Sequence, residues 1–251
     1  MMKLFMIALL STLLACSDNS SRLETPITMP VENITPTKDQ QDRRIQSENY
    51  CNAHNIPLYK NPHALFTEPE DSIVTRTQDE VVNRALALCY VGLKSEGLEQ
   101  KHLDKMNADF DIMSKLTPKE KSFATDTHPT DQEKIDAGWK YEGLHVMLWA
   151  LGFIDTLSYP DQMCDVANDV KIIHSLTGQQ FRTKAKLRNK KEIIDQADLV
   201  LRLDWACVEA RVNNKPAPGK LDKGVVMERH YALNWLIRFM NEEWDDVTTD
   251  T

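Results

Sequence analysis

The chain has 251 residues, with 38 acidic and 30 basic side chains and a formal net charge of −8 at pH 7. This length suits one domain or a pair of closely packed subdomains. The acidic balance argues against nucleic acid as a partner, because binding phosphate groups requires a basic face.

Residues 1–15 have the pattern of an export signal. Lys3 precedes an apolar run over residues 4–10, and the small residue Ala15 stands immediately before Cys16. The apolar run is shorter than the roughly 20 residues that a membrane-spanning helix needs. The pattern therefore predicts a cleaved signal peptide rather than a transmembrane anchor.

The segment LLAC at residues 13–16 resembles the lipobox of bacterial lipoproteins, in which the cysteine is acylated and becomes the first residue of the mature chain. By this resemblance, acyl chains on Cys16 anchor the protein in a membrane, and each buried methylene contributes about 0.8 kcal/mol. Ser17 stands where an inner-membrane retention signal has Asp, so the resemblance favours the outer membrane, facing the periplasm. An ordinary secretory signal cut after Ala15 is the alternative.

Residues 16–37 are rich in Ser, Thr, Pro and Asn and contain few apolar side chains. Such a stretch cannot offset the entropy lost on ordering. We therefore expect a disordered tether that links Cys16 to a folded domain over residues 38–251.

The rest of the chain shows many helix signals and almost no alternating β pattern. Capping boxes, in which Thr or Asn is followed three residues later by Glu, stand at Thr77, Thr117, Thr130 and Asn189. Together with a first helix over residues 38–55, the periodicity predicts about seven helices, over 78–95, 100–115, 118–124, 131–154, 161–176, 190–212 and 224–244. The expected fold is an all-α single domain.

The stretch GLHVMLWALGFI, residues 143–154, is apolar on nearly all sides, so its helix is expected at the centre of the fold. Glu142 shares a face with Trp149 on this helix, and His145 lies one turn further on. A carboxylate in such an apolar setting must be paired, hydrogen-bonded or protonated.

Two other helices repeat this arrangement. An acid stands two turns before a tryptophan at Asp198 and Trp205, and again at Glu228 and Trp235. Three arginines also lie on apolar faces: Arg84, Arg202 and Arg229. The simplest interpretation is a set of interhelical acid–arginine pairs with aromatic walls that hold the helices in register, since breaking one buried pair costs roughly 3–5 kcal/mol.

The alternative interpretation is chemistry at the buried acids. Glu142 and His145 form Glu-x-x-His, the spacing of di-iron carboxylate bundles, but those bundles need two such motifs and this chain has one. With Asp198 and Glu228, they are the candidate ligands or proton carriers. No His-Glu-x-x-His or Gly-x-Ser-x-Gly motif is present, so the sequence assigns no metal and no cofactor and leaves open whether the chain is an enzyme.

Four cysteines follow Cys16: Cys51, Cys89, Cys164 and Cys207. An oxidising compartment would permit two disulfides in any of three pairings, and buried free thiols are the alternative. No pair has Cys-x-x-Cys spacing, so neither a zinc knuckle nor a redox motif is indicated.

Acidic residues crowd the end of the last predicted helix: Glu242, Glu243, Asp245 and Asp246. The helix dipole disfavours anions there by about 0.3–1 kcal/mol each. We expect the terminal segment 244–251 either to dock on a basic patch such as residues 182–191 or to fray in solvent.

Five segments resemble, in chain order, the family known as domain of unknown function 4272: RTQDEVVNRALALCYV (76–91), WKYEGLHVMLWALGF (139–153), DLVLRLDWACVEAR (198–211), VVMERHYALNWLIRF (225–239) and WDDVTTDT (244–251). The resemblance covers residues 40–251 and implies no activity, cofactor or catalytic residue. It is carried by the buried ion-pair and pocket candidates: Arg84, Glu142, Trp149, Asp198, Arg202, Trp205, Glu228, Arg229 and Trp235.

Three functions fit these observations. The first is a membrane-tethered binding or interaction module of the cell envelope with no catalytic role, whose partner is an unidentified envelope protein or ligand. Its candidate surfaces are a pocket framed by Trp149, Trp205 and Trp235, or the basic run Arg182, Lys184, Lys186, Arg188, Lys190 and Lys191. The second is the metal-dependent or acid–base enzyme, and the third is an immunity or inhibitor lipoprotein, because acidic proteins can neutralise basic enzymes through charge steering.

Overall fold

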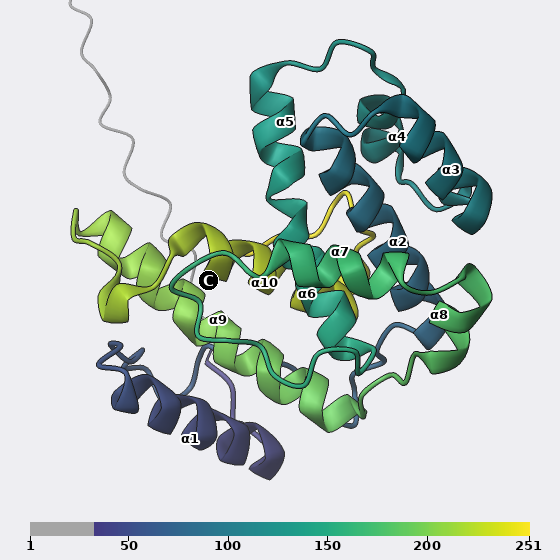
Figure 1. Cartoon of the computed structure of the whole chain (residues 1–251). Helices are drawn as coiled ribbons and strands as arrows, with labels where there is room; N and C mark the ends of the chain where they lie inside the picture. The colour runs from purple at the N-terminus through teal and green to yellow at the C-terminus, as the bar shows by residue number, and fades with distance from the viewer. Residues whose placement is uncertain (1–32) are drawn as a thin grey trace, which may run out of the picture. The chain divides into compact units, whose positions relative to one another are not determined.

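The computed structural model describes residues 33–251, and these residues form a single helical unit, Asn33–Thr251 (Figure 1). The expected signal peptide, Cys16 and nearly all of the expected tether lie outside the described residues. Within residues 33–251 every regular element is a helix. The prediction of an all-α single domain is therefore confirmed.

The α-helices are α1 (Lys38–Ala53), α2 (Gln78–Ser95), α3 (Gln100–Phe110), α4 (Pro118–Thr125), α5 (Asp131–Gly138), α6 (Lys140–Ala150), α7 (Val166–His174), α8 (Gly178–Lys184), α9 (Lys190–Val212) and α10 (Lys223–Leu236). Short 3₁₀ helices are η1 (Ile112–Ser114), η2 (Pro218–Lys220) and η3 (Phe239–Asn241). The predicted bounds of α2 and α9 agree with the structure to the residue.

Helix starts follow the capping residues. Thr77, Thr117, Thr130 and Asn189 each accept a hydrogen bond from the backbone three residues on, and the glutamate there bonds back to the cap. Thr177 does the same with a glutamine and begins α8, which the sequence analysis missed. The Thr-x-x-Gln spacing was the available signal, because glutamine can close a capping box as glutamate does.

One predicted helix, over residues 131–154, is wrong as a continuous element. It divides into α5 and α6 at Trp139, directly after Gly138, where glycine makes the helix less stable than alanine would by roughly 0.5–1 kcal/mol. The helix predicted over 161–176 begins only at Val166, where Asp165 caps it. Residues 159–165 therefore form a loop in front of α7, and this loop carries Cys164.

Two other predicted helices are too long. The helix over 100–115 ends at Phe110, because Asp111 takes a left-handed conformation with φ 53°. The helix over 224–244 ends at Leu236, because Arg238 is also left-handed, with φ 53°. Such residues stop the regular backbone hydrogen bonding of a helix.

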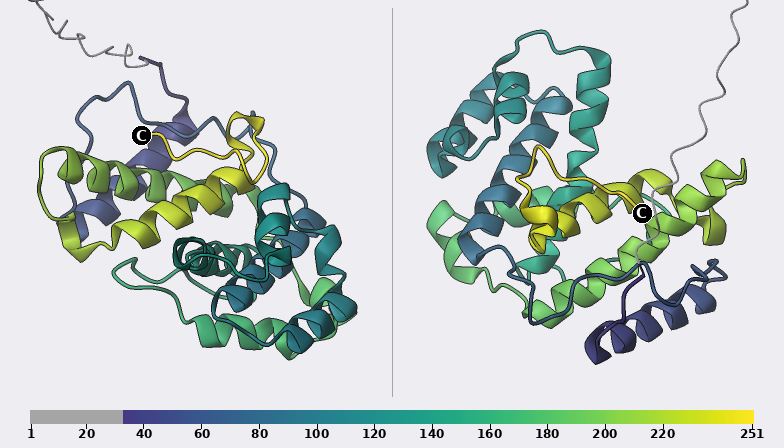
Figure 2. Two further views of the ribbon diagram at one scale, coloured as in Figure 1. Left: turned by 90° about the horizontal axis from the view of Figure 1, so that it is seen from above. Right: turned by 180° about the vertical axis from the view of Figure 1, so that it is seen from behind.

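Helix α6 lies at the centre of the fold, as predicted. All of its residues from Tyr141 to Ala150 are buried. It packs between α2 and α10, and α10 then contacts α9, which contacts α1. Figure 2 shows α1, α9 and α10 gathered on one side of the molecule and α2 to α5 on the other.

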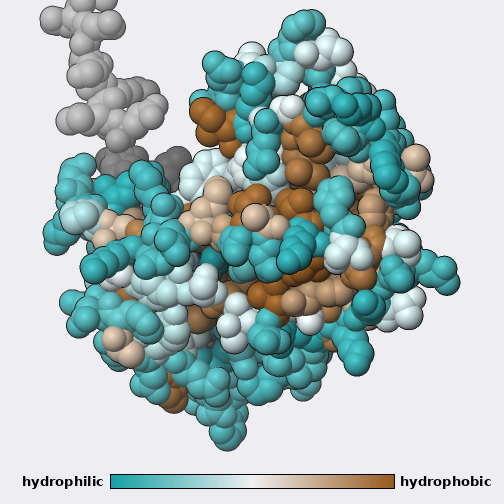
Figure 3. Space-filling view, viewed as in Figure 1, coloured by the Kyte–Doolittle hydropathy of each residue, from teal (hydrophilic) through white to brown (hydrophobic). Residues whose placement is uncertain are grey.

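Polar side chains cover most of the face shown in Figure 3, and apolar residues are visible along its middle, around α6 and α7. Among residues 33–251, no helix is both long and apolar enough to cross a membrane.

The terminal segment 244–251 docks, but the expected basic patch at 182–191 is the wrong surface. Trp244 and Val247 are buried, and the Trp244 ring packs edge-on against Tyr231 and Trp235. Because α10 ends at Leu236, the acids that follow are not at its last turn. Three of them have partners of their own: the carboxylate of Asp245 accepts a hydrogen bond from the backbone of Lys119, Glu243 pairs with Arg76, and the carboxylate of Glu242 accepts a hydrogen bond from the backbone of Thr248.

Replacing Gly92 with alanine should destabilise the domain by about 1–3 kcal/mol, the usual cost of overpacking. A Cβ atom at Gly92 would lie 2.5 Å from the ring of Tyr141, so this buried ring, or α2 and α6 themselves, would have to shift. Urea denaturation measures the difference. The control is Gly138→Ala, whose Cβ would meet nothing closer than the Ser95 hydroxyl at 3.6 Å and which should not destabilise the domain and could gain up to about 1 kcal/mol. Equal stabilities of the two variants would contradict the prediction.

Candidate functional site

Glu142 and Arg229 form a fully buried ion pair between the central helix and α10. Glu142 is 0% exposed, and its Oε2 atom lies 2.9 Å from Nε of Arg229. Its Oε1 atom accepts a hydrogen bond of 2.5 Å from the backbone nitrogen of Cys164. The second guanidine nitrogen, Nη1 of Arg229, donates to the backbone oxygen of Ser158. One carboxylate thus joins α6, α10 and the loop before α7.

The other predicted acids and arginines are paired, but not all in the expected way. Asp198 and Arg202 form a bidentate pair one turn apart within α9, so this pair does not join two helices. Arg84 pairs instead with Glu120 of α4, at 2.5 Å. Sequence spacing found the charged residues, whereas Glu120 was hidden because its carboxylate also closes the capping box at Thr117.

Glu228 pairs with a lysine rather than an arginine. Both of its carboxylate oxygens lie within 3.2 Å of Nζ of Lys140. Burial nevertheless raises the pKa of Glu228 above its usual range, because the nearby ammonium of Lys140 offsets only part of the desolvation. The Glu142 carboxylate also raises it.

The raised pKa of Glu228 makes folding stability depend on pH. The folded state holds the carboxyl proton more tightly than the unfolded chain, so this group contributes stability that is present at low pH and lost as pH rises through the folded pKa. In urea unfolding from pH 4 upward, Glu228→Gln should therefore lose less stability than the original chain, because glutamine stays neutral. Identical pH profiles for the two proteins would exclude this effect.

The three tryptophans do not frame one pocket, so that expectation is wrong. Trp149 lies beneath the guanidinium of Arg188, Trp205 packs edge-on against Tyr59, and Trp235 packs against Trp244. Each of these tryptophans stands two turns after an acid on its own helix. The three rings nevertheless lie apart, because α6, α9 and α10 pack these faces against different neighbours.

A cavity of about 210 Å³ lies between α6, α9 and α10. Its rim is formed by residues of the loop after α6, most of them exposed, and its interior by buried or partly buried apolar side chains with Arg229. The interior walls are Trp149, Leu199, Val200, Leu203 and Val226. Arg229 is 2% exposed, and its third guanidine nitrogen, Nη2, has no hydrogen-bond partner. Arg229 lines the cavity but its Nη2 atom is closed to solvent, so an oxygen acceptor of a small molecule would reach this donor after a small shift of the side chain.

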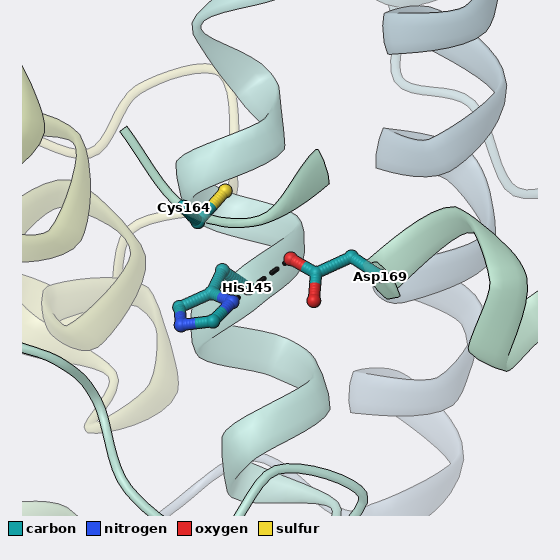
Figure 4. A group of neighbouring side chains, drawn as sticks. All are labelled: His145, Cys164 and Asp169. Atoms are coloured by element: carbon teal, nitrogen blue, oxygen red, sulfur yellow. Dashed lines mark hydrogen bonds and ion pairs between the residues drawn. The ribbon is translucent and has the colours of Figure 1, made fainter. Parts of the chain in front are cut away.

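His145 lies on α6 but does not act together with Glu142. Its Nδ1 atom lies 2.8 Å from Oδ2 of Asp169 on α7, and Cys164 lies beside this pair (Figure 4). The sequence analysis missed Asp169 and the position of Cys164. Asp169 and Ile173 are the buried residues of α7, so an acid on an apolar stripe was the available signal for Asp169.

Much of the basic run is engaged within the domain. Arg182 pairs with Asp79, and Arg188 donates to three backbone oxygens, including that of Trp149. Lys190 donates to the backbone oxygen of Ile73, and Lys191 pairs with Asp195. The remaining members of the run are Lys184 and Lys186. The run is therefore mainly a set of intramolecular contacts.

Cys51, Cys89, Cys164 and Cys207 are all buried free thiols, so the structure contains neither of the disulfides considered above. Burial raises the pKa of Cys51 to about 11 and that of Cys207 to about 12. Such thiols remain protonated near neutral pH and are poor nucleophiles.

The sequence matches the family described as domain of unknown function (DUF4272) over residues 43–247. The chain therefore belongs to this family, and the resemblance seen in the five sequence segments is confirmed. No curated protein and no solved structure matches the chain.

Proposed function

We propose that the chain is a membrane-tethered binding module of the cell envelope, anchored through an acylated Cys16 in the outer membrane. Its helical domain binds a small molecule in the cavity beside Arg229. The observation that carries this proposal is the unpaired Nη2 of a guanidinium that is 2% exposed at the cavity wall.

The charges around the cavity favour an uncharged ligand. Arg229 is already neutralised by Glu142, and Asp155 adds a negative charge at the rim. An anion would therefore lose hydration without gaining a net positive partner. A neutral molecule with an apolar body and a carbonyl oxygen would bury its body against Trp149 and Leu199 and accept the hydrogen bond from Nη2.

The state of the buried acids supports binding rather than acid–base catalysis. Both oxygens of Glu142, Asp198 and Glu228 accept hydrogen bonds from protein groups. A general base must lie within hydrogen-bonding reach of a substrate proton, and none of these three residues lines the cavity. Glu142 and Glu228 instead hold different helices and loops together, and Asp198 holds Arg202 within α9.

Three isosteric probes test the ligand class: benzamide, benzoate and benzamidine. Only benzamide is both uncharged and an oxygen acceptor, so it should bind most tightly, with a roughly millimolar dissociation constant for so few atoms. Saturation-transfer NMR with the purified chain measures binding, and the indole signal of Trp149 should shift. Absence of benzamide binding, or tighter binding of benzamidine, would refute the assigned ligand class.

A matched pair of variants locates the binding. Leu199→Trp fills the cavity from the α9 wall and keeps both members of the ion pair, and it should abolish benzamide binding. Val212→Trp adds the same ring on the same helix at a position that is 68% exposed, and it should leave binding unchanged. Equal binding by both variants would place the ligand elsewhere.

The anchor is tested separately in bacterial cells. The chain should incorporate radiolabelled palmitate and fractionate with the outer membrane, whereas Cys16→Ser should lose both the label and the membrane association. Cys207→Ser is the control, because Cys207 is buried in the folded domain and should not affect acylation. Label retained by Cys16→Ser would disprove acylation at this residue.

A further inference from the structure

A second group of chemically active side chains lies next to Glu142, which accepts a hydrogen bond from the backbone nitrogen of Cys164. His145, Cys164 and Asp169 each offer one metal-ligating atom, and these three atoms lie within 4.8 Å of one another. They come from α6, from the loop before α7 and from α7. Figure 4 shows His145 and Asp169 pointing toward each other, with Cys164 beside them.

The polar atoms of this cluster are incompletely paired. Asp169 is 0% exposed, yet its Oδ1 atom has no hydrogen-bond partner, and Nε2 of His145 also has none. Leaving a buried carboxylate oxygen without a partner is costly, so such an atom calls for an explanation.

The domain contains a comparable pair that lacks these features. His230 and Asp204 are buried and lie 2.8 Å apart, the same distance as His145 and Asp169. Neither His230 nor Asp204 has an unpaired buried atom, and no cysteine forms a three-residue ligand group with them among the described residues. The remaining polar atoms of the His230–Asp204 pair are not sealed from solvent, whereas Nε2 of His145 and Oδ1 of Asp169 are both enclosed and unpaired.

We propose that His145, Cys164 and Asp169 bind one divalent transition metal ion of the zinc class. Imidazole, thiolate and carboxylate are zinc ligands, and three protein ligands with an open fourth position are typical of catalytic zinc sites. The thiolate and the carboxylate together balance the charge of the ion inside the domain. This site goes beyond the ligand-binding function proposed above.

Binding requires small movements that the local structure allows. Bond lengths of about 2.0–2.3 Å in a tetrahedral site bring ligand atoms to roughly 3.3–3.6 Å from each other. Atoms as far apart as 4.8 Å must therefore move closer, and the 2.8 Å hydrogen bond between His145 and Asp169 must open. The loop at 159–165 can supply the movement, because its residues next to Cys164 are exposed. Burial raises the pKa of Cys164, so metal binding must release the thiol proton to solvent.

Titration with cobalt(II) tests the site directly. The purified full chain, stripped with chelator and kept reduced, should bind one equivalent of cobalt. The bound ion should show a thiolate-to-cobalt charge-transfer band and the intense visible bands of four-coordinate cobalt, and zinc should displace it. Absence of the charge-transfer band at saturating cobalt would overturn the proposal, whatever the variants show.

Variants identify the ligands. Cys164→Ser should remove the charge-transfer band, and Asp169→Asn should weaken cobalt binding by roughly 100-fold or more. Cys207→Ser and Asp204→Asn are matched controls at the comparable buried positions, and both should retain the spectrum and the affinity. Circular dichroism establishes that each variant is folded. Loss of cobalt binding in the controls equal to that in the site variants would also overturn the proposal.

Discussion

Replacing Glu142 with alanine is expected to lower the free energy of unfolding by about 3–5 kcal/mol, the usual result of removing one partner of a buried ion pair. The substitution leaves the guanidinium of Arg229 without a counter-charge at a position that is 2% exposed. It also removes the acceptor for the backbone nitrogen of Cys164. Urea denaturation of the original chain and of the variant measures the loss.

Two further variants test whether the unpaired buried charge causes this loss of stability. Asp109→Ala breaks the exposed pair with Lys105 and should cost no more than about 0.5 kcal/mol. The double variant Glu142→Leu with Arg229→Met replaces both charges with apolar groups, and it should recover most of the loss because no charge remains buried. A Glu142→Ala variant within about 1 kcal/mol of the original chain would show that Arg229 is hydrated in the folded state.

Trp244→Ala should cost about 3–5 kcal/mol, as large-to-small substitutions of buried aromatic residues do. Trp244 is 4% exposed, and its ring packs over Gly143 of the central helix and beneath the guanidinium of Arg84. Removal of the ring therefore opens a cavity between the C-terminal segment, α2 and α6. Thermal and urea unfolding both report the loss.

The comparison variants are Trp244→Phe and Met240→Ala. Phenylalanine keeps part of the packing and should lose less stability than alanine. Met240 is 72% exposed and close to Trp244 in sequence, so its truncation should be almost neutral. If Trp244→Ala were as stable as Met240→Ala, the C-terminal segment would not be docked in solution.

Helix starts were predictable because the signals that make them are local. A cap such as Thr77 or Asn189 bonds to a backbone group three residues away, and α2 and α9 begin where those caps stand. Helix ends and breaks were less predictable. The division follows Gly138 and α10 ends before the left-handed Arg238, but neither a single glycine nor an arginine by itself requires a helix to stop.

The candidate site shows the same contrast between local features, which the sequence predicts, and tertiary contacts, which it does not. Periodicity correctly indicated that Glu142 and Asp198 would be buried, since their helical faces are apolar. The partners could not be read from spacing, because Arg229, Lys140 and Asp169 reach their partners through the tertiary fold. The grouping of His145 with Cys164 was hidden for the same reason, as it requires the loop before α7 to fold back on α6.

Glu142 connects the proposed ligand cavity to the proposed metal site. One of its carboxylate oxygens accepts a hydrogen bond from Arg229, and the other accepts one from the backbone nitrogen of Cys164. A ligand that moves the guanidinium of Arg229 therefore also shifts Glu142 and, through it, the backbone that positions the Cys164 thiol. Thermodynamic reciprocity then requires the ion to alter ligand affinity by the same factor. Cobalt titrations with and without benzamide would measure this factor, and a value of one would mean that the two sites act independently.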